Sequence, residues 1–114
     1  MKIDELLTYL ASTDETFASL QAEVSYAEDM LKHIKGSFVS ASNNSVSKAT
    51  EDFYASKNYT NHISKLHKLN AELLTFRNKR RTVEMKIEVW RTLEASRRKN
   101  NVWSIQWNVQ RNWF

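Results

Sequence analysis

The sequence predicts an all-α protein, a long antiparallel helical hairpin with coiled-coil-like packing. Three observations support this prediction. The 114 residues include one glycine, no proline and no cysteine, so helix breakers are nearly absent. Apolar residues recur at alternating spacings of three and four in both halves of the chain. A stretch of small polar residues separates these halves and predicts the connection of the hairpin.

The first arm of the hairpin is expected over about residues 3–35. Its apolar residues follow a seven-residue repeat, which is typical of a helix with one narrow buried stripe, here called the seam. The seam of this arm consists of Ile3, Leu6, Leu10, Phe17, Leu20, Val24, Ala27, Leu31 and Ile34, and Phe38 continues the repeat past its expected end. Thr13 interrupts the repeat, and Ser12 precedes Glu15 by three residues, as in a capping box. An unbroken helix and a break near these residues fit equally well.

The connection is expected over residues 36–57 and the second arm over about residues 59–98. Between residues 50 and 57 a short helix and a loop both fit the sequence. The second arm measures roughly 60 Å at 1.5 Å per residue. Its seam consists of His62, Leu66, Leu69, Leu73, Phe76, Arg80, Val83, Ile87 and Trp90. We expect Trp90 in the core, and Arg80 either to lay its stem along the seam or to fix the register.

Charge is distributed unevenly along the chain. Residues 1–35 hold three lysines and seven acids, a net charge of −4, whereas residues 77–99 hold nine Lys or Arg and three Glu, a net charge of +6. Charges beside a seam select the partner and orientation of packed helices, so one interpretation is that the two arms attract each other. Another is that the basic segment contacts the phosphates of nucleic acid.

No catalytic, metal-binding or cofactor-binding pattern stands out in the sequence. His62 and His67 are five residues apart and point to different faces of a helix, and His33 is distant in sequence. A single glycine cannot build a phosphate-binding loop. We therefore expect a protein that is not an enzyme and needs no cofactor. Without a signal peptide or an apolar run of membrane-spanning length, we expect it to be soluble and cytoplasmic.

A two-helix hairpin buries only one stripe per arm, so a homo-oligomer or another protein is expected to complete the core. Residues 102–114 form an aromatic tail that includes the sequence WSIQWNVQRNWF. Apolar residues at every second position predict a strand that pairs with another copy or another protein. The alternative is a helix with Val102, Ile105, Val109 and Trp113 on one stripe.

The stretch IEVWRTLEASRR at residues 87–98 resembles small helical proteins encoded by tailed phages, often near recombination and replication genes. The sequences IDELL at residues 3–7, TDE at 13–15 and YASKNY at 54–59 are similar in placement. The resemblance covers about residues 1–101, taken as the hairpin domain, and leaves the tail outside. It implies an accessory protein that assists recombination or single-strand annealing by binding single-stranded DNA or a recombination protein.

Two alternatives to this function stay open. One is a protein-interaction module that inhibits or recruits a host protein, such as an anti-defence inhibitor, in the host cell cytoplasm. The other is a purely structural homo-oligomer. Under any binding function, the candidate contacts to nucleic acid or a partner are the cations outside the seam and the tail residues with stacking faces. These residues are Arg81, Arg97, Arg98, Lys99, Trp103, Trp107, Arg111 and Trp113.

Overall fold

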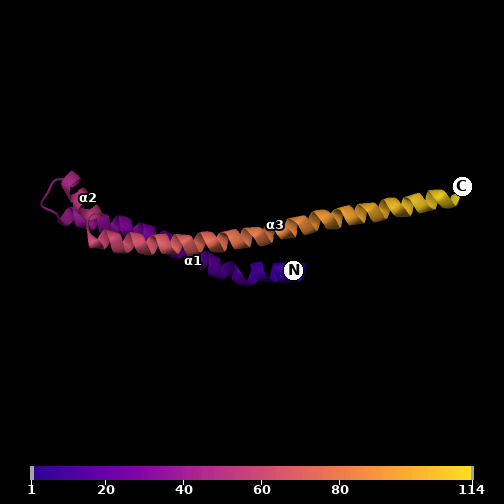
Figure 1. Cartoon of the computed structure of the whole chain (residues 1–114), viewed down its shortest axis with the longest axis horizontal. Coiled ribbons are helices and arrows are strands. Elements are labelled where there is room, and N and C mark those ends of the chain that lie inside the picture. The colour runs from indigo at the N-terminus through magenta and orange to yellow at the C-terminus, as the bar shows by residue number, and fades with distance from the viewer. Residues whose placement is uncertain (1, 114) are drawn as a thin grey trace. The chain divides into compact units, whose positions relative to one another are not determined.

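The protein consists of three helices in a computed structural model that describes residues 2–113, with side chains described for residues 2–101. The helices are α1 (Ile3–Ala41), α2 (Val46–Tyr54) and α3 (Lys57–Trp113), as Figure 1 shows. The all-α prediction is confirmed for the described residues. No helix among them is both long and apolar enough to cross a membrane.

Segments of α1 and α3 combine into two compact units. The first unit comprises Met1–Ser12 and Lys79–Phe114, and the second comprises Thr13–Asn78. Within each unit, a segment of α1 packs against a segment of α3 that runs in the opposite direction. The predicted antiparallel pairing of two long helices is therefore confirmed within each unit.

The core of the second unit is the seam between α1 and α3. Val24, Leu66 and Leu73 are buried there. The partly buried residues packed against them are Phe17, Leu20, Ala27, Leu31, Ile63 and Leu69. The ring of Phe17 stacks on that of Phe76 with a centroid distance of 5.7 Å. Both helices contribute the apolar positions of their seven-residue repeats, so the repeats determine which faces meet.

The first unit continues the same type of seam. Leu6 is buried against Val83 and Ile87, and partly buried side chains of Ile3, Tyr9 and Leu10 surround them. Helix α1 is unbroken near Ser12, whose hydroxyl donates to the carbonyl of Tyr9, 3.2 Å away, and does not cap a new helix. The capping-box alternative is therefore wrong.

Arg80 crosses the seam of the first unit. It is half-buried, and its Nη1 donates a hydrogen bond of 3.0 Å to the main-chain carbonyl of Leu10. A main-chain acceptor occupies a fixed level along α1, so this bond favours one alignment of the two segments over its neighbours. The geometry supports the register role considered for Arg80.

The connection contains more structure than the sequence predicted. Helix α1 continues to Ala41, six residues past the expected end at residue 35. Helix α2 begins after Ser45, whose side chain accepts a hydrogen bond from the backbone N–H of Lys48 at 3.3 Å. This N-cap satisfies a donor that the first helical turn leaves unpaired, which favours a helix over the alternative loop.

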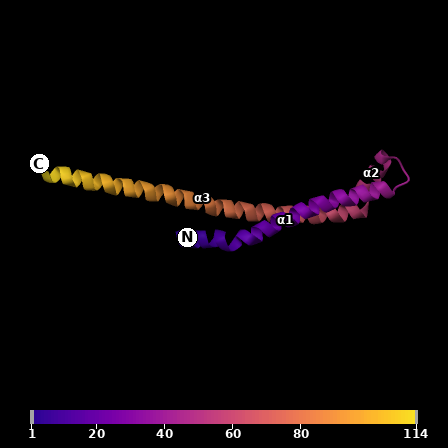
Figure 2. The same cartoon turned by 180° about the vertical axis from the view of Figure 1, so that it is seen from behind.

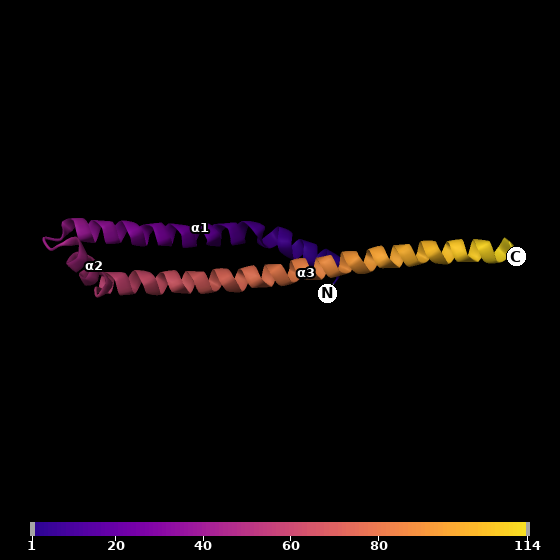
Figure 3. The same cartoon turned by 90° about the horizontal axis from the view of Figure 1, so that it is seen from above.

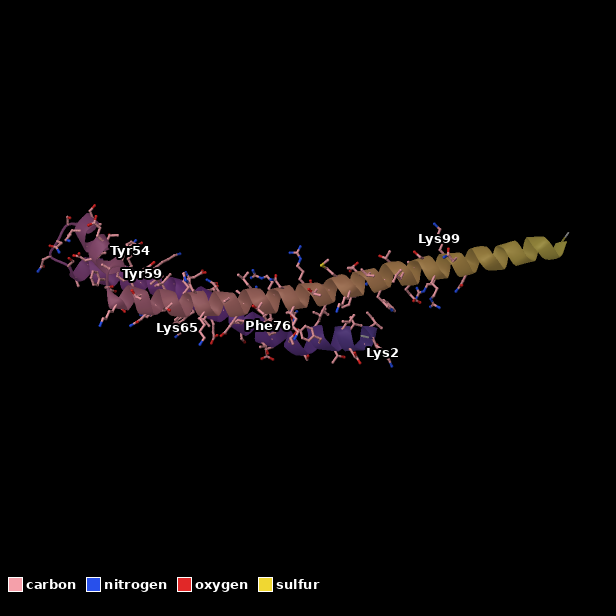
Figure 4. All side chains as sticks on the ribbon, in the orientation of Figure 1. Lys2, Tyr54, Tyr59, Lys65, Phe76 and Lys99 are labelled. Carbon is pink, nitrogen blue, oxygen red and sulfur yellow. The ribbon has the colours of Figure 1, made fainter. Side chains whose placement is uncertain are left out.

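Phe53 holds α2 in place within the second unit. It is completely buried, and its ring lies 5.5 Å from the rings of both Phe38 and Tyr59. The contact with Phe38 explains why α1 extends beyond its predicted end. Figures 2 and 3 show α2 between the end of α1 and the beginning of α3. The neighbouring rings of Tyr54 and Tyr59 are 5.0 Å apart (Figure 4).

Two expectations for α3 are wrong. Trp90 is 42% exposed, although the repeat placed it in the core, because α1 begins at Ile3 and its packing reaches only as far as Ile87. The strand predicted for the tail is not observed over its described residues 102–113, because α3 continues to Trp113. A lone strand leaves its backbone groups unpaired, whereas a helix pairs them internally, and the helical alternative is the one found. The side chains of this segment lie outside the described ones.

Gly36→Ala should stabilise the protein. Gly36 lies inside α1, and a Cβ at this position would meet no neighbouring atom within 4 Å. Because alanine restricts the unfolded chain more than glycine does, the free energy of unfolding should rise by about 0.5–1 kcal/mol. Urea denaturation followed by circular dichroism measures this change. A loss of stability would contradict the open surroundings of Gly36.

Candidate docking surface on α3

Three large apolar side chains of the first unit are exposed on one side of α3. Met85, Val89 and Leu93 are 61%, 58% and 64% exposed. They follow one another at intervals of four residues, so they form a ridge along the helix, here called the α3 row. The exposed Trp90 is three residues from Leu93 and adds to the same surface.

The α3 row faces away from the segment of α1 in its own unit. Ile87 is buried against Leu6, and Val89 follows Ile87 by two residues, or about 200° of helical rotation. Val89 therefore points to nearly the opposite side of α3. Leu93 lies beyond Ile87, where the described contacts with α1 end. Folding of a single chain therefore leaves the α3 row uncovered.

Cationic side chains surround the α3 row. Arg81 precedes Met85 by four residues and Arg97 follows Leu93 by four, so a cation stands at each end of the ridge. Lys86 lies beside it, three residues before Val89, and both Arg81 and Lys86 are exposed. A shallow hollow on this side is lined by Arg81, Glu84, Met85, Glu88 and Val89. The surface thus combines an apolar ridge with a mainly basic edge.

Several charged side chains near the α3 row form ion pairs with residues three or four positions away on the same helix. Glu88 Oε1 lies 3.1 Å from Arg91 Nη1. Glu94 accepts a hydrogen bond from Arg97 and lies 4.0 Å from Arg98 Nε. The hydrogen bond from Arg97 lowers the pKa of Glu94, and the charges of Arg97 and Arg98 add to this effect. Glu94 therefore stays ionised at neutral pH and partly neutralises both arginines.

Some of the predicted contact residues are exposed without a described ion pair, and others form ion pairs with Glu94. Arg81 and Lys99 are exposed on α3, and Figure 4 labels Lys99. Arg97 and Arg98 are tied to Glu94. The predicted residues whose side chains lie outside the described ones are Trp103, Trp107, Arg111 and Trp113.

The predicted seam residues are found mostly in the two cores. Those buried there or packed against a core are Leu10, Phe17, Leu20, Val24, Leu31, Leu69, Leu73, Val83 and Ile87, with Phe76 stacked on Phe17. Trp90 is the exception described above. The α3 row was missed, although its four-residue spacing, offset from the seam, is a signal that the sequence contains.

The second unit has a hollow of its own. It is lined by Glu23, Tyr26, Ala27, Met30, His62, Lys65 and Leu69. Its edge carries charges of both signs, as does the surface around the α3 row, where Glu84 and Glu88 lie beside the cations. Among residues 2–101, no three His, Asp or Glu side chains gather as a metal site would require. The α3 row differs from this hollow because it presents three large apolar side chains that are mostly exposed at regular spacing.

Comparison of the chain with protein-family models, curated proteins and solved structures finds no match.

Replacing Ile87 and Val89 separately should distinguish the seam from the α3 row. Ile87→Ala removes buried atoms and should lower the free energy of unfolding by about 2–4 kcal/mol. Val89→Ala removes exposed atoms and should change it by less than about 0.5 kcal/mol. Thermal and urea denaturation of dilute protein would measure both. An equal loss of unfolding free energy in the two variants would contradict the placement of Val89 outside the core.

Proposed function

We propose that the chain acts by binding another protein through the α3 row, without catalysis. The observation that supports this proposal most directly is the exposure of Met85, Val89 and Leu93 on one continuous helix. Contiguous apolar patches on a protein surface often mark interaction sites. Anchors spaced four residues apart suit a partner helix that packs alongside α3.

The chemistry of the row favours protein over nucleic acid as the bound molecule. The side chains of Met85, Val89 and Leu93 have no N–H or O–H group to bind phosphates or base edges. They also have no aromatic face on which a base would stack, although the neighbouring Trp90 has one. An apolar stripe of another helix gains most from covering them, because it removes apolar surface from water on both sides.

The resemblance to phage proteins suggests which proteins this surface serves. A recombination protein is the partner that fits an accessory role in recombination or single-strand annealing. A host protein is the alternative, with the chain acting as an anti-defence inhibitor or a recruiter. Both kinds of partner fit the same proposal, because binding either protein requires a protein-docking surface.

Replacing Val89 and Leu93 together by aspartate should abolish capture of the partner. Tagged protein would be incubated with nuclease-treated host lysate, and the retained proteins identified by mass spectrometry. Wild-type protein should retain a partner that V89D/L93D loses, because two carboxylates would have to be desolvated in the interface. Asn61→Asp with Ser64→Asp adds the same charge at exposed positions of the second unit and should behave as wild type. Retention of the same partner by V89D/L93D would overturn the proposal.

Binding of single-stranded DNA is the second candidate function. The exposed cations Arg81 and Lys99 and the net charge of +6 over residues 77–99 favour it. Phosphate contacts by these groups would make the affinity fall with salt.

Replacing Arg97, Arg98 and Lys99 by alanine tests this second function. Loss of three phosphate contacts should flatten the plot of log affinity against log salt by about 2, at about 0.7 per contact for single strands. Glu94→Gln should tighten binding instead, because it removes the carboxylate that partly neutralises two arginines. Fluorescence anisotropy with a labelled oligothymidine measures both effects. Affinity that does not change with salt would exclude the DNA-binding function.

A further inference from the structure

Helix α1 exposes a row of mostly small side chains on the side that faces away from its own seam. Ala18, Ala22 and Tyr26 follow one another at intervals of four residues, and all three are exposed, Tyr26 to 67%. Ala22 precedes the buried Val24 by two residues, or about 200° of helical rotation, so it points to nearly the opposite side of α1. Folding of the second unit therefore leaves this row uncovered.

Acids stand at both ends of this row. Glu15 and Asp29 are exposed and lie seven residues before and after Ala22, which is close to two helical turns in each direction, so both share its side of α1. Residues 13–31 hold five acids and no Lys or Arg, a net charge of −5 within the second unit alone. The exposed residues that form this surface, here called the acidic face of α1, are Glu15, Ala18, Ala22, Tyr26 and Asp29.

We propose that the acidic face of α1 in a second copy of this chain covers the α3 row, so that the protein associates with itself through two different surfaces. This inference rests on the proposed function of the α3 row as a protein-docking surface. It names the occupant of that row in the absence of another partner.

Charge favours this occupant, since the two surfaces carry opposite signs. Residues 79–99 hold eight Lys or Arg and three Glu, a net charge of +5. At about 100° per residue, Arg81, Lys86 and Arg97 lie within about 80° of Val89, whereas the three glutamates lie about 100° or more from it. The side of α3 that presents the row is therefore cationic. An acidic helix complements it, whereas a second α3 row would bring cations of both copies together.

The charges at the ends of the two rows match in spacing. Arg81 and Arg97 lie eight residues, about 12 Å, on either side of Val89. The two acids of the acidic face lie seven residues, about 10.5 Å, on either side of Ala22. When Val89 and Ala22 are level, each arginine is within about 2 Å of the level of one acid, in whichever direction the second helix runs.

Side-chain size and length match as well. Met85, Val89 and Leu93 are large, whereas two of the three residues in the opposing row are alanines, so a ridge on α3 meets a shallow strip on α1. Tyr26 then covers one end of the α3 row. The acidic face is about 21 Å long and the α3 row about 12 Å, so the second copy covers all three apolar side chains.

Charge reversal at the ends of the two rows tests this contact. R81E/R97E places acids opposite acids, and E15K/D29K places cations opposite cations. Because like charges replace two attractive pairs in each contact, each variant should raise the dissociation constant for self-association at least about tenfold. A quadruple variant with all four substitutions should return to within about threefold of wild type, because the opposing charges again attract. Sedimentation velocity over a range of concentrations measures the mass against 13.4 kDa per chain.

Control variants carry the same change of net charge at exposed positions outside both surfaces. K57E/K68E matches the first variant, and E51K/E72K matches the second. Both controls should associate as wild type does, which separates a specific contact from an effect of net charge. Circular dichroism and the melting temperature of each variant verify folding in dilute solution.

Three results would overturn the inference, each in a distinct way. A wild-type protein that stays at 13.4 kDa at every concentration excludes the self-association, but it leaves the proposed function intact if V89D/L93D still loses a captured partner. Self-association that neither charge variant weakens excludes a contact between these two surfaces. Self-association that the control variants weaken equally depends on net charge and not on the two rows.

Discussion

The packing of one narrow apolar stripe of α1 against one narrow apolar stripe of α3 determines the rest of this structure. Leu6 and Val24 of α1 are buried against Val83 and Leu73 of α3, among other residues of the two cores. A pair of helices hides only the stripe along which the two meet. Every apolar residue outside that stripe remains in contact with water unless something other than the paired helix covers it.

Helix length adds to this constraint. Helix α3 has 57 residues and α1 has 39, a difference of 18 residues or about 27 Å. Leu93 and Trp90 are exposed because they lie beyond the described packing of α1 in their unit. Met85 and Val89 are exposed for the other reason, since they point away from the seam. Two different geometric causes thus produce one continuous apolar surface with cations along its edge.

The sequence predicts those parts of the fold that depend on periodicity. The repeat through Phe17, Val24 and Leu31 identifies the buried face of α1 without further information, because heptad spacing and burial are directly coupled. The repeat cannot say how far the opposing helix extends, so it wrongly places Trp90 in the core. Helix α1 extends past residue 35, where Phe38 continues the repeat and its ring packs against that of Phe53.

The α3 row was harder to predict from the sequence, because the position of α1 decides which apolar residues of α3 are exposed. Charge along the sequence favours Arg97 and Arg98 as contact residues, but Glu94 partly neutralises both. Aliphatic residues at the spacing of the α3 row resemble core residues until the position of α1 is known. Alternation of apolar and polar residues in the tail predicted a strand. A helix pairs the backbone N–H and C=O groups without a second strand, and α3 is helical up to Trp113.

Methionine oxidation measures directly whether the α3 row is a docking surface. Met85 is exposed in the row, and the half-buried Met30 of the second unit serves as an internal reference. We expect the rate at which dilute peroxide oxidises Met85, relative to Met30, to fall when a captured partner is added, because the partner covers Met85. A ratio that stays the same with and without the partner would contradict a docking role for the α3 row.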